Sequence, residues 1–194
     1  MSTKQREKSL QTRQEIMNQA VAVFCRKGFK QATIAEITSQ AGYAKGNFYR
    51  HWGSKDEIFL DIMEDRLRSY RATRRSRLEQ AESSEQAVHV IMDFLDTIID
   101  DTAWARVILE FTTHAFGSDE LKQKLNQSSY RLNSSLFADL LARFVTDREA
   151  TRKLGALVTA LFEGFLIQKF LETGVLSKSD LREAVLLLAR NILR

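Results

Sequence analysis

The chain of 194 residues has no proline, one cysteine and no long apolar run. Without proline, no ring interrupts the backbone hydrogen bonds of a helix. The lone Cys25 excludes an internal disulfide, and its apolar neighbours predict a buried side chain. No stretch approaches the roughly 20 apolar residues of a membrane span, and no apolar segment of a signal peptide follows the charged amino-terminal residues. We therefore expect a cytoplasmic protein with no membrane partner.

Motifs for metals, phosphates and cofactors are also missing. The three histidines lie far apart, at His51, His89 and His114, and offer no ligand spacing typical of zinc. The chain has no glycine-lysine-serine phosphate loop, no nucleophile elbow and no dinucleotide fingerprint. We expect no metal, no cofactor and no catalytic residue.

One enzyme alternative stays open. Asp93, Asp96 and Asp100 lie on one helical face, and all-helical isoprenoid synthases bind Mg²⁺-diphosphate through aspartate-rich helices. Such an enzyme needs a second acidic motif on a facing helix, and the sequence offers none. A solvated acidic face is therefore the simpler interpretation.

Positive charge is concentrated at the front of the chain. Residues 1–55 carry ten Lys and Arg against three acidic residues, a net charge of +7, while the remaining residues carry 19 against 22, a net charge of −3. An excess of one sign within one segment favours a partner of the opposite sign. The front segment therefore indicates a polyanion such as nucleic acid.

The chain is rich in helical periodicity, because apolar residues recur at intervals of three and four. Helix starts are marked by Ser or Thr followed three residues later by Glu, Gln or Asp. These pairs are Thr33/Glu36, Ser54/Glu57, Ser83/Gln86, Thr146/Glu149 and Ser177/Asp180. Helix ends are expected at Gly28, Gly42 and Gly174, where glycine can adopt the left-handed conformation. The pattern predicts an all-α fold with helices at 12–27, 34–41, 45–52, 55–78, 84–101, 103–115, 119–145, 147–173 and 178–193.

The first three predicted helices have the order of a helix-turn-helix domain over residues 10–55, with the motif itself at about 33–52. In this arrangement the helix after the turn enters the major groove of DNA. Phe48 and Trp52 define the inner side of that helix, so the polar residues fall on the opposite side. We therefore expect double-stranded DNA as the partner.

The polar side of this helix supplies the candidate DNA contacts. Asn47 and Arg50 can pair with base edges, and Gly46 lets the helix approach them closely. Tyr49 and His51 flank this face, where they can reach phosphates. The amino ends of the neighbouring helices, at Thr33 and Lys55, expose N–H groups that attract phosphate.

The stretch GYAKGNFYRHWGSKDEIF, residues 42–59, resembles the signature of TetR-family transcriptional regulators. The resemblance covers about residues 10–60 and implies a DNA-binding domain followed by a ligand-binding and dimerisation domain over residues 56–194. It also implies a repressor that a small-molecule inducer releases from its operator. Carried over to this sequence, it implies DNA contacts at Thr33, Lys45, Gly46, Asn47, Tyr49, His51 and Lys55. Ala44 departs from the pattern, which has a capping Ser or Thr there.

The last two predicted helices carry the candidates for a homodimer interface. One has small residues at intervals of four, which let another helix approach closely, and the other has a wide apolar side. The candidates are Ala156, Ala160, Gly164, Leu181, Val185, Leu188 and Ile192. A twofold pair of these helices predicts a four-helix interface, with two recognition helices spaced to read a palindromic operator.

Candidate ligand-binding residues lie on the middle helices. They are Phe94, Trp104, Ile108, Glu110, Phe111, His114, Phe162 and Glu163. If the two glutamates face one cavity lined by aromatic rings, a cationic amphiphile is the expected ligand. A DNA-binding regulator that takes no small ligand remains an alternative.

Overall fold

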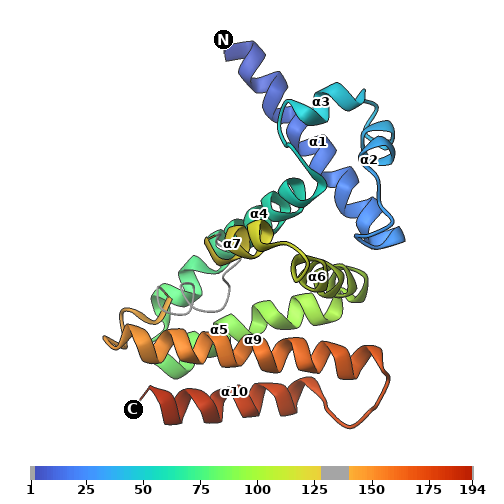
Figure 1. The fold of residues 1–194 in the computed structure, drawn as a ribbon. Helices are drawn as coiled ribbons and strands as arrows, with labels where there is room; N and C mark the ends of the chain where they lie inside the picture. The colour runs from blue at the N-terminus through green and yellow to red at the C-terminus, as the bar shows by residue number, and fades with distance from the viewer. Residues whose placement is uncertain (1–2, 128–139, 194) are drawn as a thin grey trace. The chain divides into compact units, whose positions relative to one another are not determined.

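The computed structural model describes residues 3–127 and 140–193, in which helices occur and strands do not (Figure 1). The helices are α1 (Thr3–Lys27), α2 (Ile34–Gln40), α3 (Lys45–Tyr49), α4 (Lys55–Gln80), α5 (Ser84–Asp100), α6 (Thr102–Ala115), α7 (Asp119–Gln127), α9 (Arg148–Phe170) and α10 (Lys178–Ile192). The all-α prediction is confirmed. Of the predicted helix at 119–145, residues 128–139 lie outside the described ranges, and residues 142–144 form a turn.

Contacts divide the chain into two compact units. The first comprises Met1–Asp65 and Ala103–Lys124, and the second comprises Arg66–Thr102 and Leu125–Arg194. This division differs from the functional boundary proposed at 55/56, because α6 returns to pack against the amino-terminal helices. The functional boundary itself stays a prediction.

The core of the first unit is a cluster of aromatic rings from α1, the α1–α2 connection, α4 and α6. Phe24, Phe29, Phe59 and Phe111 are fully buried, and Trp104 is 1% exposed. The rings of Phe59 and Phe111 stack with centroids 3.9 Å apart, and Phe29 meets Phe111 edge-on at 5.0 Å. Burial of each such ring stabilises the fold by about 1.5–3 kcal/mol.

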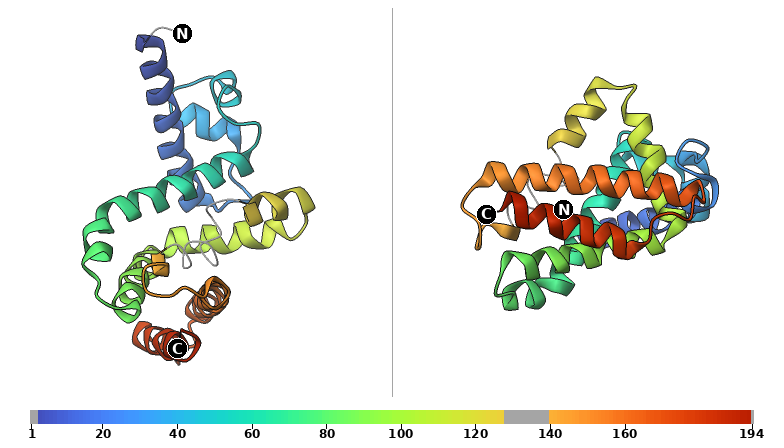
Figure 2. Two further views of the ribbon diagram at one scale, coloured as in Figure 1. Left: turned by 90° about the vertical axis from the view of Figure 1, so that its left-hand side faces the viewer. Right: turned by 90° about the horizontal axis from the view of Figure 1, so that it is seen from below.

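In the second unit, α10 lies beside both α9 and α5 (Figure 2). Ion pairs fix α10 along α5: Arg190 with Glu85 at 2.6 Å, Arg182 with Asp93 at 2.9 Å and also with Asp96, and Lys178 with Asp100 at 2.8 Å. These partners run in opposite order along the two helices. The two helices are therefore antiparallel.

Most predicted helix starts are confirmed by their caps. The side chains of Thr33, Ser54, Ser83 and Ser177 each accept a hydrogen bond from the backbone N–H three residues later, at 3.2 Å. The prediction at Thr146 is wrong, because Asp147 caps α9 and accepts from the N–H groups of Glu149 and Ala150. A carboxylate at this position bonds two N–H groups and suits the positive end of the helix dipole.

Two of the three predicted glycine ends are confirmed. Gly28 and Gly42 have φ of +84° and +76° and follow α1 and α2. At α9 the prediction is wrong, because the helix ends at Phe170 and Glu172 takes the left-handed conformation with φ of +52°. Gly174, also left-handed, lies in the following loop.

The largest boundary error is at the start of α1, which begins at Thr3 instead of residue 12. Residues 3–11 carry no apolar stripe, so periodicity does not reveal them, but most of them favour helix. In contrast α3 is shorter than predicted and ends at Tyr49 instead of residue 52.

Candidate nucleic-acid interface and ligand pocket

The turn between α2 and α3 is held by backbone hydrogen bonds. Gly42 donates to the carbonyl of Ser39 at 3.1 Å, and Tyr43 donates to that of Thr38 at 2.8 Å. This pair of bonds is the Schellman motif, which needs the left-handed residue that Gly42 supplies. The inner side of α3 is anchored by Phe48, which is fully buried.

The opposite side of α3 is open to solvent. Lys45, Gly46, Tyr49 and Arg50 are exposed, and no atom lies within 4 Å of where a Cβ at Gly46 would be. Asn47 is half-buried, and its amide makes only a long 3.5 Å bond, to the carbonyl of Ala44. The structure therefore brings the residues predicted to contact DNA from α3 together on one outward side.

The first residues of α3 carry no side-chain cap, because Ala44 makes no such bond. Thr33, at the start of α2, is exposed while it caps that helix. His51 is half-buried, and burial, together with the positive charges of Arg13 and Arg50, lowers its pKa. A lowered pKa leaves the ring neutral at pH 7, so His51 can donate a hydrogen bond to a phosphate without adding charge.

The side chain of Lys55 is engaged within the chain. Its Nζ donates to three backbone carbonyls of the α1–α2 connection, at 2.6 Å to Phe29, 3.2 Å to Lys30 and 2.9 Å to Ala32. The ammonium also lies 4.5 Å from the centre of the Phe29 ring, and burial lowers its pKa. Since all three N–H donors of the ammonium are engaged, the side chain clamps this connection, while the phosphate contact predicted at the amino end of α4 stays a prediction.

The remaining basic residues of the front segment divide into paired and unpaired groups. Arg13 pairs with Asp61, and Arg26 and Lys27 both pair with Glu36. The cations without an acidic partner among the described residues are Lys4, Arg6, Lys8, Lys30, Lys45 and Arg50. These six charges are available to an external polyanion.

The predicted ligand residues fall in both units. Trp104, Ile108, Glu110, Phe111 and His114 belong to the first unit, and Phe94, Phe162 and Glu163 belong to the second. Glu110 is not a free anchor, because its Oε2 accepts the N–H of Phe29 at 2.7 Å. His114 lies 3.0 Å from a carboxylate oxygen of Asp56. Trp104 and Phe111 belong to the aromatic core described above.

The contact of Glu110 is a structural role that sequence reasoning missed. Its carboxylate lies 2.5 Å from where a Cβ at Gly28 would be, so it occupies space that only glycine leaves. On the same helix, Arg106 donates to the carbonyl of Cys25 at 2.9 Å. No local pattern in the sequence indicates these contacts, which join residues 81 positions apart.

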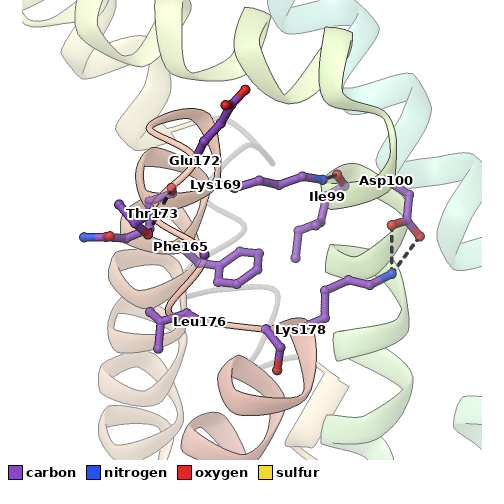
Figure 3. Close-up of a pocket in the computed structure, with 11 residues that line it drawn as sticks. Ile99, Asp100, Phe165, Lys169, Glu172, Thr173, Leu176 and Lys178 are labelled. Carbon is purple, nitrogen blue, oxygen red and sulfur yellow. Dashed lines mark hydrogen bonds and ion pairs between the residues drawn. The ribbon is translucent and has the colours of Figure 1, made fainter.

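A pocket of about 460 Å³ opens in the second unit where α5 ends and α9 connects to α10 (Figure 3). Ile99, Phe165 and Leu176 supply apolar walls. Two lysines also line the pocket: Lys169 donates to the carbonyl of Ile99, and Lys178 bonds both oxygens of Asp100 at 2.8 and 3.1 Å. None of the predicted ligand residues lines this pocket. Those predictions rest on helical periodicity, whereas much of the pocket is formed by the loop between α9 and α10, which has no such periodicity.

The aspartates of the enzyme alternative have a structural role. Arg182 donates to both Asp93 and Asp96, and Lys178 holds Asp100, so these carboxylates connect α5 to α10. Within residues 3–127 and 140–193, no group of three or more potential ligands could hold a metal ion. In the same ranges, every helix is too short or too polar to cross a bilayer.

The predicted dimer residues separate by exposure. Ala156, Ala160 and Gly164 lie on the exposed side of α9. In contrast Leu181 and Val185 are 6% and 0% exposed within the chain's own second unit, so we remove them from the predicted interface. Their α10 positions face the chain's own helices because α10 is packed on both α5 and α9. Leu188 and Ile192 remain partly exposed.

Two family models together match most of the chain. Residues 16–62 match bacterial regulatory proteins of the tetR family, and residues 65–194 match the carboxyl-terminal region of BetI-type transcriptional repressors. The HTH-type transcriptional regulator BetI of Brucella suis is 25% identical over 170 residues, which span 84% of this chain and 82% of the relative. The HTH-type transcriptional regulator YfiR of Bacillus subtilis is 28% identical over 141 residues, or 70% of this chain and 66% of the relative.

Solved structures share the fold. FadR from Bacillus subtilis in complex with stearoyl-CoA has a TM-score of 0.71 at 17% identity, covering 93% of this chain and 97% of that one. A TetR transcriptional regulator from Rhodococcus sp. RHA1 has a TM-score of 0.70 at 19% identity, covering 95% and 97%. With its helix-turn-helix and these matches, the chain belongs to the TetR family of DNA-binding transcriptional regulators, which are not enzymes, and its larger part is of the BetI type.

Proposed function

We propose that the chain is a homodimeric repressor that binds a palindromic operator through the outward side of α3 and leaves it when a small molecule binds. The observation that carries the DNA-binding part is the open, polar side of α3 around Gly46. A helix without a side chain at its centre approaches base edges closely. The unpaired cations nearby neutralise phosphates.

Within this surface, Asn47 and Arg50 are proposed to read bases. Asn pairs with adenine and Arg with guanine in a bidentate manner. Lys45, Tyr49 and His51 are proposed to contact phosphates, together with the amino end of α2 at Thr33. The side chain of Lys55 positions the α1–α2 connection, and the amino end of α4 at Lys55 is proposed to contact phosphate through its backbone N–H.

The proposed dimer interface is the exposed side of α9 with the outer residues of α10. The small residues Ala156, Ala160 and Gly164 leave space for a partner helix, and nothing lies within 4 Å of a Cβ at Gly164. Leu157 and Ile167 on α9 are 43% and 49% exposed. Burial of such exposed apolar side chains against a second copy of the chain would stabilise a dimer.

Among the residues predicted to bind a ligand, Glu163 is the candidate anchor, because its carboxylate has no ion-pair partner among the described residues. It is half-buried, and burial raises its pKa. Phe94 and Phe162 belong to the same unit and are nearly buried. A ligand with a cationic group and an apolar body would supply the missing charge.

The pocket of Figure 3 is a second candidate for the ligand. Its apolar walls suit the body of an amphipathic anion, whose head would have to replace the Ile99 carbonyl at Lys169 or Asp100 at Lys178. The related fold of FadR takes stearoyl-CoA. Thermal-shift measurements with matched cationic and anionic amphiphiles separate the two sites. If no compound of either charge stabilises the protein, the alternative of a regulator without a small ligand is favoured.

Selection of bound fragments from genomic DNA tests the operator, because it yields both sequence and half-site spacing. We expect a palindrome with half-sites about 34–36 Å apart. Asn47→Ala and Arg50→Ala should change the preferred base at one position each, at a cost of about 1–3 kcal/mol for the original base. Tyr49→Ala should weaken all operators about equally. The same uniform loss from all three variants would contradict the assignment of base readers.

A further inference from the structure

The first nine residues of α1, residues 3–11, form an exposed stretch that we call the basic segment. Thr3 to Lys8 are all exposed, and Leu10 is 58% exposed. The segment contains Lys4, Arg6 and Lys8, none of which has an acidic partner among the described residues. With Glu7 the segment carries a net charge of +2, and within the part of the chain that the structure describes its cations form no ion pair.

The basic segment starts where α1 crosses α3. The Thr12 hydroxyl donates to the Tyr43 hydroxyl at 3.5 Å, and the Arg13 guanidinium lies 5.6 Å from the centre of the Trp52 ring. Tyr43 lies two residues before the start of α3, and Trp52 lies three residues after its end. Residues 3–11 therefore continue past the crossing, and Figures 1 and 2 both show the amino end of α1 extending beyond α3.

Helical periodicity places two of the three cations on the side of α1 that faces α3. At about 100° per residue, Lys8 lies about 40° and Lys4 about 80° around the helix from Thr12, which contacts Tyr43. Arg6 lies about 120° away in the other direction. At about 1.5 Å per residue, Lys4 is about 12 Å along the axis from Thr12. The major groove is about 12 Å wide, so both lysines can reach phosphates that border a groove occupied by α3.

The helix dipole makes this arrangement unfavourable in the free protein. The amino end of a helix carries partial positive charge, which disfavours nearby cations, and the first turn of α1 holds no acidic residue. A polyanion beside the segment would remove this repulsion. Binding of phosphates is therefore the condition under which the placement of these lysines becomes favourable.

We propose that the basic segment binds DNA phosphates beside the groove that α3 enters, with Lys4 and Lys8 as the contacts. The inference rests on the proposed role of α3 in DNA binding. Because phosphate contacts carry no sequence information, the segment adds affinity and salt dependence without changing the preferred bases.

The double variant Lys4→Gln/Lys8→Gln tests the proposal with the full chain and a random-sequence duplex as the probe. The logarithm of the binding constant is measured against the logarithm of salt concentration between about 50 and 200 mM. We expect the slope for the dimer to become less steep by about 3.6, since each phosphate contact contributes about 0.9 and each of the two copies loses two contacts. Gln is a good helix former, and circular dichroism verifies that the variant keeps its helix content.

Two controls separate a local contact from a change in net charge. Arg75→Gln/Lys122→Gln removes the same charge from exposed positions of α4 and α7, outside the proposed dimer interface, and should leave the slope close to that of the parent protein. Arg6→Gln removes a cation from the other side of the basic segment and should have a smaller effect than either lysine. A Lys4/Lys8 variant whose slope equals that of the parent or of the Arg75/Lys122 control would overturn the inference alone. Failure of the parent protein to bind any duplex would overturn it together with the proposed function.

Discussion

At the scale of single residues, the charged side chains of the first unit differ in whether they have a hydrogen-bond partner within the chain. Glu110 and Lys55 have the chemistry of a ligand anchor and a phosphate contact, yet each satisfies the backbone around Phe29. Arg50 and Lys45 have similar chemistry but no acidic partner among residues 3–127 and 140–193. The distinction depends on tertiary contacts, so residue type and position in a motif do not reveal it.

Lys55→Met tests the clamp. Met has a similar length and helix propensity but no N–H donor, so the carbonyls of Phe29 and Ala32 lose their partner. We expect the free energy of unfolding, measured by urea denaturation, to fall by about 1–3 kcal/mol. Lys45→Met, at an exposed position, should change it by less than about 0.5 kcal/mol. Unchanged stability with a loss of DNA affinity would return Lys55 to the role of a phosphate contact.

Glu163→Gln tests whether the half-buried carboxylate is held at a cost to stability. Burial raises its pKa above the ordinary 4.5, so the folded state binds the proton more tightly than the unfolded state. Stability from this group is then present at low pH and is lost as pH rises through the folded pKa. We expect the variant to be more stable than the parent at neutral pH, and the difference to vanish in acid.

The matched control for this comparison is Glu183→Gln, at an exposed position of α10. Urea denaturation of both variants and the parent at acid and neutral pH gives the comparison. A Glu163→Gln variant that is less stable than the parent at neutral pH would show that the carboxylate has a stabilising partner.

At the scale of helices, the end of α9 is a site of backbone strain. Thr173 and Glu172 donate to the carbonyls of Gln168 and Lys169 at 3.3 and 3.1 Å, which is a Schellman motif with Glu172 in the left-handed position. This conformation costs a residue with a side chain about 1–2 kcal/mol. Glycine avoids that cost but loses more freedom on folding.

We therefore expect Glu172→Gly to raise the free energy of unfolding by up to about 1 kcal/mol, measured as an increase in the urea midpoint. Gly174→Ala is the opposite control, because Gly174 has φ of +65° and no atom within 4 Å of an added Cβ. Only backbone strain acts there, so this variant should be less stable. If both variants shifted in the same direction, strain would not be the cause.

Sequence reasoning located helices well where a local signal marks them. Ser177 and Gly42 carry their capping chemistry in neighbouring residues, and both predictions are confirmed. The first turns of α1 have no apolar stripe, and the end of α9 uses a glutamate where glycine is usual. The outward side of α3 followed from periodicity, whereas the pocket beside Lys169 joins α5 with a distant loop and leaves no trace in the sequence.

At the scale of the whole molecule, the proposed dimer is the feature with the clearest test. Ala160 lies in the exposed strip of small residues on α9, so a carboxylate there would be buried without a partner when two copies meet. We expect Ala160→Glu to sediment as a monomer, with the fold intact and operator affinity strongly reduced. Gln123→Glu, at an exposed position of α7, adds the same charge and should remain dimeric. A parent protein that is monomeric at micromolar concentration would refute the interface.

The return of α6 to the amino-terminal helices limits how this regulator can be engineered. A graft of residues 1–65 onto a foreign sensor would leave the rings of Phe29 and Phe59 uncovered and the amide of Phe29 without its acceptor. Residues 102–115 would have to be transferred together with the DNA-binding helices, although residues 66–101 separate the two pieces in the chain. Chimeras of this protein therefore require two junctions, and a single cut after the helix-turn-helix would produce an insoluble or unfolded product.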